Sequence, residues 1–276
     1  MPMKQTTICF ILLFTVNLSC SQVVVEKISE NEFTIGKAIK IKSPRLDETR
    51  NLNIYIPQSY YQDSLKSYPV IYLLDGSRDE DFIHISGIVQ FGSFNWINIL
   101  PESIVVGIGN VDRSRDFTYP SQNKLDQKEF PTSGRSENFI AFIEEELQPF
   151  IDSSYRTTEM KTVIGQSLGG LLVTEILFRK PNLFDNYVLV SPSLWWDDER
   201  ILGRDLTSFG SIKSVYIAVG KEGELMERTA KELFEKLKKN LPENTSLYFE
   251  FLEDKTHGDA LHIAAYSAFE KIFKHK

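Results

Sequence analysis

The sequence predicts a single α/β domain, built on a mostly parallel central β-sheet with helices on both faces. Two observations predict this class. Short, continuous apolar runs at 70–74 and 104–108 are typical of strands that are buried on both sides. Segments with the periodicity of amphipathic helices alternate with such runs along the chain. This alternation favours parallel strands joined by helical crossovers.

The first half of the chain supplies four strands and two helical segments in this interpretation. Segments 33–42 and 52–57 form an opening antiparallel pair across a polar connection. The two apolar runs named above follow as the third and fourth strands, with helical character across 79–100 between them. From Ser136 onward, apolar side chains recur on one helical face, and Pro149 is expected to end that helix.

The second half continues the alternation without an internal repeat, a low-complexity tract or a linker, so residues 21–276 are expected to form one domain. A strand beginning near Val163 runs into a helix that stops before Pro181. The remaining predicted elements are strands 187–190, 215–219 and 247–252, and helices 226–237 and 260–273.

Composition and charge exclude some classes of partner. The chain has 276 residues, of which 42% are hydrophobic and 25% charged, an ordinary balance for a globular protein. Its net charge of -7 argues against nucleic acid or an anionic membrane surface as a partner. The sequence does not indicate an oligomeric state.

The first twenty residues have the pattern of an export signal. Lys4 supplies a positive charge, and residues 8–16 form an apolar core too short for a permanent membrane span. Ser19 and Cys20 follow, and this arrangement resembles a bacterial lipoprotein signal in which Cys20 becomes the lipidated first residue. Asn17 departs from that pattern, so plain secretion is the alternative. Either reading predicts an exported protein, periplasmic or anchored to a membrane.

Cysteine and metal chemistry are not expected at a site. Cys9 lies in the leader, so the mature chain keeps at most Cys20 and has no intramolecular disulfide. The four histidines lack the spacing of a metal motif and have no cysteine partners.

The stretch G-Q-S-L-G, residues 165–169, has the pattern of a nucleophile elbow. Ser167 follows a strand directly and precedes a helix, which is the context that such an elbow needs. Gly165 and Gly169 lack the β-carbons that would clash in a sharp turn. The start of the helix would present N–H groups to charge that develops near the hydroxyl. The alternative is a glycine-rich helix start that only packs against the sheet.

A serine hydroxyl needs a base, and His257 is the candidate. It lies in a polar loop after the last predicted strand and before the last helix. An acid that orients this imidazole should follow strand 215–219, where Glu222 is favoured over Glu224 because it is closer to the strand end. Asp254 is a third candidate, although it follows a different strand.

An oxyanion that forms during acyl transfer needs two N–H donors. Leu168, directly after the nucleophile, is one candidate. Ser77 is the other, in the turn L-L-D-G-S after the third strand, where Gly76 permits an unusual backbone.

Four separated stretches resemble one known family: Y-P-V-I-Y-L-L-D-G, I-V-V-G-I-G-N-V-D-R-S-R-D-F-T-Y-P, I-G-Q-S-L-G-G-L and S-P-S-L-W-W. The chain is similar to the "Putative esterase" family of α/β-hydrolases, and most similar to its branch of ferric-siderophore esterases of the enterobactin and salmochelin type. The resemblance implies an α/β-hydrolase fold and serine ester hydrolysis by Ser167, His257 and an acid at or near Glu222, with no cofactor. Gln166, where relatives often have histidine, and Tyr119 depart from the family pattern.

Three further residues are candidates for substrate binding. Trp195 and Trp196 follow a strand end, where their rings could hold an aryl or sugar group, although one of them could belong to the core. Arg113 could bind an anionic substrate, or it could pair within a charged cluster with Arg115 and Asp116; structural pairing is favoured.

The sequence as a whole therefore predicts an exported serine carboxylesterase that acts through an acyl-enzyme. A siderophore trilactone, an aryl ester and an acetyl ester, including esters linked to carbohydrate, are the substrate classes left open. An acyltransferase on the same scaffold, or a binding module without catalysis, are the alternatives.

Overall fold

The computed structural model describes residues 25–206 and 212–274. The chain divides into two compact units, Met1–Thr34 and Ile35–Lys276, and the helices and strands described here belong to the second. The predicted leader and Cys20 lie outside the described residues. Within the described ranges, no helix combines the length and the apolar character that crossing a bilayer requires.

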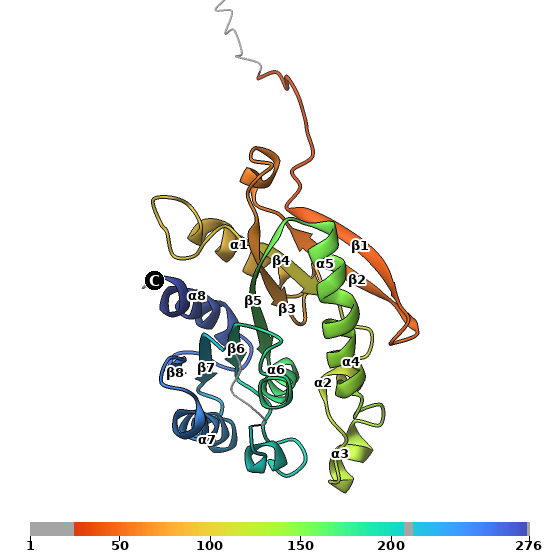
Figure 1. Ribbon diagram of the computed structural model, residues 1–276, viewed down its shortest axis with the longest axis vertical. Helices are drawn as coiled ribbons and strands as arrows, with labels where there is room; N and C mark the ends of the chain where they lie inside the picture. Colours follow the sequence, from red (N-terminus) through yellow and green to blue (C-terminus); the bar gives the residue numbers. More distant parts are fainter. Residues whose placement is uncertain (1–24, 207–211, 275–276) are drawn as a thin grey trace, which may run out of the picture. The chain divides into compact units, whose positions relative to one another are not determined.

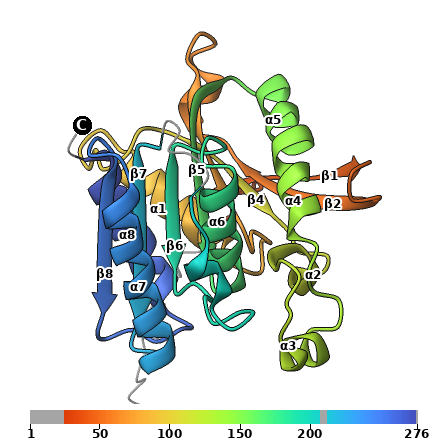
Figure 2. The ribbon, with the colours of Figure 1, turned by 60° about the horizontal axis from the view of Figure 1, so that its bottom comes forward.

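One eight-stranded sheet forms the centre of the second unit, as far as the described residues extend, with the strand order β1-β2-β4-β3-β5-β6-β7-β8. In Figures 1 and 2 it runs from the red β1 at one edge to the blue β8 at the other. The pairs β1–β2 and β2–β4 are antiparallel, and the pairs from β4 to β8 are parallel. The strands are β1 (Gly36–Ser43), β2 (Glu48–Tyr55), β3 (Tyr68–Leu73), β4 (Ile104–Ile108), β5 (Thr157–Gln166), β6 (Asn186–Val190), β7 (Ser214–Gly220) and β8 (Ser246–Leu252). The predicted fold class is confirmed.

Helices cover both faces of this sheet. Buried residues of α1 and α8 pack on one face, whereas those of α4, α5, α6 and α7 pack on the other. Figure 2 shows α4 and α5 beside the β1–β2 hairpin, and α6 and α7 farther along the sheet. The helices are α1 (Phe82–Gly92), α2 (Arg113–Phe117), α3 (Lys124–Glu129), α4 (Ser136–Phe142), α5 (Gln148–Ser154), α6 (Leu168–Arg179), α7 (Glu224–Asn240) and α8 (Ala260–Phe273).

Burial on both faces explains the continuous apolar runs in the sequence. Along β3, Val70 and Tyr72 contribute to one core, and Ile71 and Leu73 contribute to the core on the opposite face. The residues of β4, β6 and β7 are all buried, and alternation with exposed polar residues is absent there.

Pro149 does not end the helix that begins at Ser136, and this prediction is wrong. After α4, a π-helical turn at Ile143–Leu147 leads directly into α5, and Pro149 lies in the first turn of α5. Proline is tolerated there because it directly follows the π-helical turn, in which the regular i→i−4 hydrogen bonds of an α-helix are already interrupted and the Gln148 N–H bonds to the Ile143 carbonyl.

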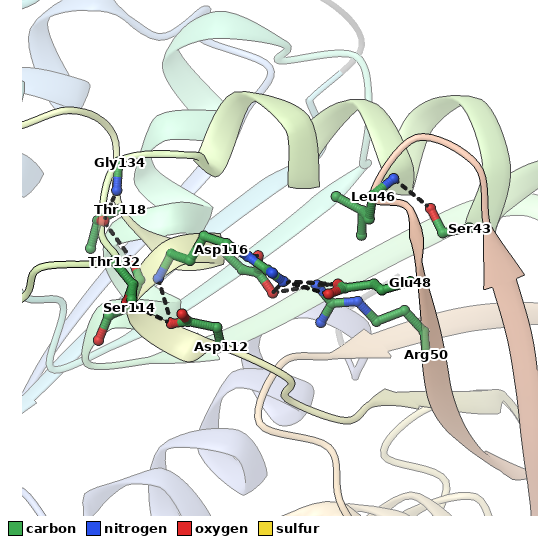
Figure 3. Close-up of polar contacts among 11 residues, drawn as sticks. Ser43, Leu46, Glu48, Arg50, Asp112, Ser114, Asp116, Thr118, Thr132 and Gly134 are labelled. Carbon is green, nitrogen blue, oxygen red and sulfur yellow. Dashed lines mark hydrogen bonds and ion pairs between the residues drawn. The ribbon is translucent and has the colours of Figure 1, made fainter.

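Two short helices, α2 and α3, were not predicted, and α2 is held by a buried ionic network (Figure 3). Arg50, on β2, is almost fully buried and pairs with Glu48 and with Asp116 of α2. Arg115 binds the same two carboxylates. These pairs tie the β1–β2 hairpin to α2, the helix that begins with Arg113.

Candidate active site

Ser167 lies at a strained corner between β5 and α6. Its φ of 59° and ψ of -122° place a residue with a β-carbon in a conformation that usually requires glycine. Its N–H donates to the Val190 carbonyl at 3.0 Å, and the Ser193 N–H donates to its carbonyl at 3.0 Å. The neighbouring strand and the turn that follows it therefore hold the corner in place.

The glycine positions at which a β-carbon would clash are not all those that the sequence predicted. A β-carbon at Gly165 would lie 2.5 Å from the Gly169 carbonyl oxygen, so this position requires glycine. At Gly169 the nearest atom would be 3.4 Å away, which is an ordinary contact. The close approach is instead at Gly170, whose β-carbon would lie 2.9 Å from the α-carbon of Pro192. The helix start thus packs tightly one residue later than expected.

His257 and Glu222 form the central hydrogen bond of the site. His257 lies in the loop between β8 and α8, and its Nδ1 is 2.6 Å from Glu222 Oε2. The Glu222 side chain is 3% exposed and the His257 side chain 48% exposed. A carboxylate on Nδ1 leaves Nε2 on the open side of the ring, as a proton-accepting imidazole requires.

Two further donors hold the Glu222 carboxylate. The Ser191 hydroxyl, which follows β6, donates to Oε1, and so does the Gly220 N–H at 2.9 Å. Burial raises the pKa of Glu222, but the hydrogen bonds from His257, Ser191 and Gly220 outweigh it and hold that pKa below its usual range. Glu222 is therefore kept ionised against the imidazole.

Ser167 and His257 line one open cleft at the carboxyl ends of the strands, with a volume of about 440 Å³. Within the described residues no hydrogen bond joins the two side chains. The Ser167 hydroxyl instead lies 3.3 Å from the Ser193 hydroxyl. Gln166 donates a hydrogen bond to the His257 carbonyl and so ties the elbow to the histidine loop. Reacting side chains are often this loosely aligned in the absence of substrate.

The two expected oxyanion donors lie at the ends of β3 and β5. Leu168 is the first residue of α6, so its N–H belongs to the unpaired amides of the helix start. Ser77 lies in the turn after β3, where the Gly76 N–H donates a hydrogen bond to the Ile108 carbonyl at 3.0 Å. The Ser77 N–H is occupied by Glu80 Oε2 at 3.3 Å.

Arg113 is held by Asp75, an acid that was not among its predicted partners. Its guanidinium makes two hydrogen bonds to Asp75, at 2.7 and 2.9 Å, and a third to the Gln166 carbonyl at 3.2 Å. Arg113 is thus paired within the protein, as favoured, rather than free to bind an anion. Its partner is Asp75 and not the expected cluster with Arg115 and Asp116. Arg113 still lines the cleft and is 33% exposed.

Trp196 belongs to the core, which is the alternative that the sequence left open for one of the two tryptophans. It is fully buried, and its indole N–H donates to the Tyr119 carbonyl at 2.9 Å. Trp195 is partly buried against the same core and lies beside Phe130. Of the described residues, those that line the cleft include neither tryptophan.

Several residues that build the site were not predicted: Asp75, Gln166, Ser191 and Ser193. Gln166 ends β5, and the other three lie within three residues of the end of β3 or β6, so position near the carboxyl end of a strand was the signal that could have found them. Within the described ranges, no group of three or more histidine, cysteine, aspartate or glutamate side chains is arranged to hold a metal ion.

Comparison with known proteins decides the family. The model of the family described as "Putative esterase" matches residues 43–266. The chain belongs to this family. It is 33% identical over 234 residues to the ferri-bacillibactin esterase BesA of Bacillus subtilis (strain 168), an alignment that covers 76% of this chain and 80% of that protein.

Solved structures agree with this assignment. The IroE-like serine hydrolase from Shewanella oneidensis superposes with a TM-score of 0.75 at 30% identity, covering 87% of this chain and 80% of that one. The BES protein from Bacillus cereus gives a TM-score of 0.75 at 27% identity, covering 90% and 99%. The fold is that of these α/β-hydrolases, and the chain is a carboxylic ester hydrolase by family.

Proposed function

We propose that the protein hydrolyses carboxylic esters with Ser167 as nucleophile, His257 as general base and Glu222 as the acid that orients the imidazole. The hydrogen bond between Glu222 and His257 Nδ1, beside a cleft that also contains Ser167, is the observation that carries this proposal. The strained corner at Ser167 supports it, since such strain is concentrated at functional sites.

In the proposed reaction, the Ser167 hydroxyl turns from Ser193 toward His257, gives its proton to Nε2 and attacks the ester carbonyl. Glu222 stabilises the imidazolium that results. The N–H groups of Leu168 and Ser77 receive the oxyanion. His257 then returns the proton to the departing alcohol. In the second half of the reaction, a water molecule gives a proton to His257 Nε2 and attacks the carbonyl carbon of the acyl group. The acyl group leaves as a carboxylic acid, and His257 returns the proton to Ser167.

For the substrate, we propose an ester of a ferric siderophore. BesA is named for ferri-bacillibactin, and a siderophore enterobactin esterase of Emericella nidulans is 35% identical over 99 residues, one third of each chain. Aryl and acetyl esters, including those linked to carbohydrate, are the other classes that an open cleft admits. We further propose that the protein is exported, with Cys20 as a lipid anchor.

Labelling with a fluorophosphonate, together with hydrolysis of a panel of siderophore, aryl and acetyl esters, tests this proposal. Ser167→Ala should lose labelling and at least about 10³-fold in kcat/KM while it keeps its folded circular dichroism spectrum. Ser153→Ala is the control, since it removes an exposed hydroxyl on α5, outside the cleft, and should retain labelling. Full hydrolysis by Ser167→Ala would contradict the proposal, and transfer of the acyl group to an added alcohol in preference to water would indicate an acyltransferase.

A further inference from the structure

The turn after β3 brings a carboxylate to an N–H group that the proposed reaction needs. Glu80 Oε2 accepts a hydrogen bond from the Ser77 N–H at 3.3 Å. Glu80 is exposed, and it lines the same cleft as Ser167 and His257. A side chain from the cleft wall therefore already accepts a hydrogen bond from the N–H group that the proposed reaction assigns to the oxyanion.

The other acids of this wall differ from Glu80 in their partners. Asp75 receives hydrogen bonds from Arg113 and Asn110. Burial, followed by the nearby Asp75 and Glu80 carboxylates, raises the pKa of Asp81 to about 6. For Glu80, no lysine or arginine in the described ranges lies within ion-pairing distance, so its side chain is free to leave Ser77.

We propose, on the basis of the function proposed above, that Glu80 competes with the substrate carbonyl for the Ser77 N–H and thereby sets the reactivity of Ser167. An N–H group donates one good hydrogen bond, so the oxyanion forms at Ser77 only after Glu80 has moved. While Glu80 stays, its negative charge faces the place where negative charge must develop in the transition state, and that charge is disfavoured there.

The Glu80 side chain could also act by bracing the turn after β3, and the experiment must separate this role from competition with the substrate. The Glu80 N–H donates to the Ser77 carbonyl at 3.0 Å, and the bond from the Ser77 N–H to Glu80 Oε2 adds a second brace to the turn that leads into α1; only this second bond is lost with the side chain. If bracing is the main role of the Glu80 side chain, its removal loosens the turn and slows the reaction. If competition is the main role, its removal accelerates the reaction. The two roles predict opposite signs.

The experiment measures the second-order rate constant for phosphorylation of Ser167 by diethyl 4-nitrophenyl phosphate. This reagent is neutral and needs no knowledge of the natural ester, and its phosphoryl oxygen occupies the oxyanion position. Glu80→Ala should react about 3- to 10-fold faster than the parent protein, as expected for the loss of one competing hydrogen bond. Glu80→Gln keeps an acceptor oxygen without the charge and should give an intermediate rate.

Asp79→Ala is the matched control, because Asp79 is the exposed neighbour of Glu80 and carries the same charge. Its rate should equal that of the parent, since the Ser77 N–H is bound by Glu80 and not by Asp79. Equal or slower phosphorylation of both Glu80 variants, with unchanged melting curves, would overturn the inference and leave the proposed function standing. Failure of the parent protein itself to be phosphorylated would overturn the proposed function.

Discussion

Glu222 receives hydrogen bonds from three different elements, and this arrangement holds its charge toward His257. Ser191 donates from the end of β6, Gly220 from the end of β7, and His257 contacts it from the loop after β8. These bonds lower the pKa of Glu222 despite its burial. The ionised carboxylate therefore stabilises the folded protein at every pH above the ordinary pKa of a glutamate. That contribution is lost only as the pH falls through the lowered value.

At this residue scale, the prediction concerns the two glutamates that the sequence left open. Glu222→Gln should reduce kcat by about 10²- to 10⁴-fold, because an amide cannot stabilise the imidazolium in the same way. Glu224→Gln should leave kcat unchanged, since Glu224 is the exposed first residue of α7. Steady-state kinetics of both variants provide the measurement, and the reverse pattern would transfer the acid role to Glu224.

At the scale of elements, the corner between β5 and α6 depends on the strands on both sides of it. β5 pairs with β3 and with β6, so the last residues before Ser167 are fixed in register. Arg113 adds a link from α2 to the Gln166 carbonyl and to Asp75 after β3. A strained backbone conformation of this kind costs about 1–3 kcal/mol in folding free energy, and it persists only where the surrounding structure holds the residue in place.

Gly165→Ala tests this dependence, because its new methyl group would meet the backbone of α6 rather than a side chain that can move. We expect a loss of about 1–3 kcal/mol in the free energy of unfolding, together with reduced esterase activity. Gly87→Ala is the control, since a β-carbon there meets nothing within 4 Å and should stabilise α1 by about 0.5–1 kcal/mol. Urea denaturation of the two variants gives the comparison, and equal stability would contradict the packing argument.

At the scale of the whole molecule, one domain carries the entire cleft. Ser167, Glu222 and His257 follow β5, β7 and β8 of a single sheet, so the proposed chemistry needs no second domain. We propose that the residues that precede this domain direct export of the protein. The proposal of export with a lipid anchor rests on the sequence around Cys20.

The anchor can be tested in bacterial cells that express the full chain and are fed an alkyne-labelled fatty acid. The protein should carry the label and fractionate with membranes, whereas Cys20→Ser should lose both properties. Cys9→Ser is the matched control, because it changes the other cysteine of the chain and should keep the label. Labelling that is absent from the parent, or that survives in Cys20→Ser, would contradict lipidation at this residue.

The sequence by itself determined the class of fold and the approximate carboxyl ends of the parallel strands, whereas the bounds of the opening pair of strands differ from the predicted ones. Local hydrophobic periodicity marks each element, and in a parallel sheet the carboxyl ends of the strands meet at one edge. For this reason the sequence alone predicts that Ser167 and His257, which are 90 positions apart in the chain, lie at one edge of the sheet, and both line one cleft.

Only the tertiary structure decided the partners of individual side chains. Whether Glu222 or Glu224 reaches the imidazole depends on the direction of the chain over a few residues, which periodicity does not encode. The burial of Trp196 and the pairing of Arg113 with Asp75 depend on segments distant in the sequence. Contacts of this kind follow from the packing of the whole chain, because each partner is supplied by an element with its own independent local pattern.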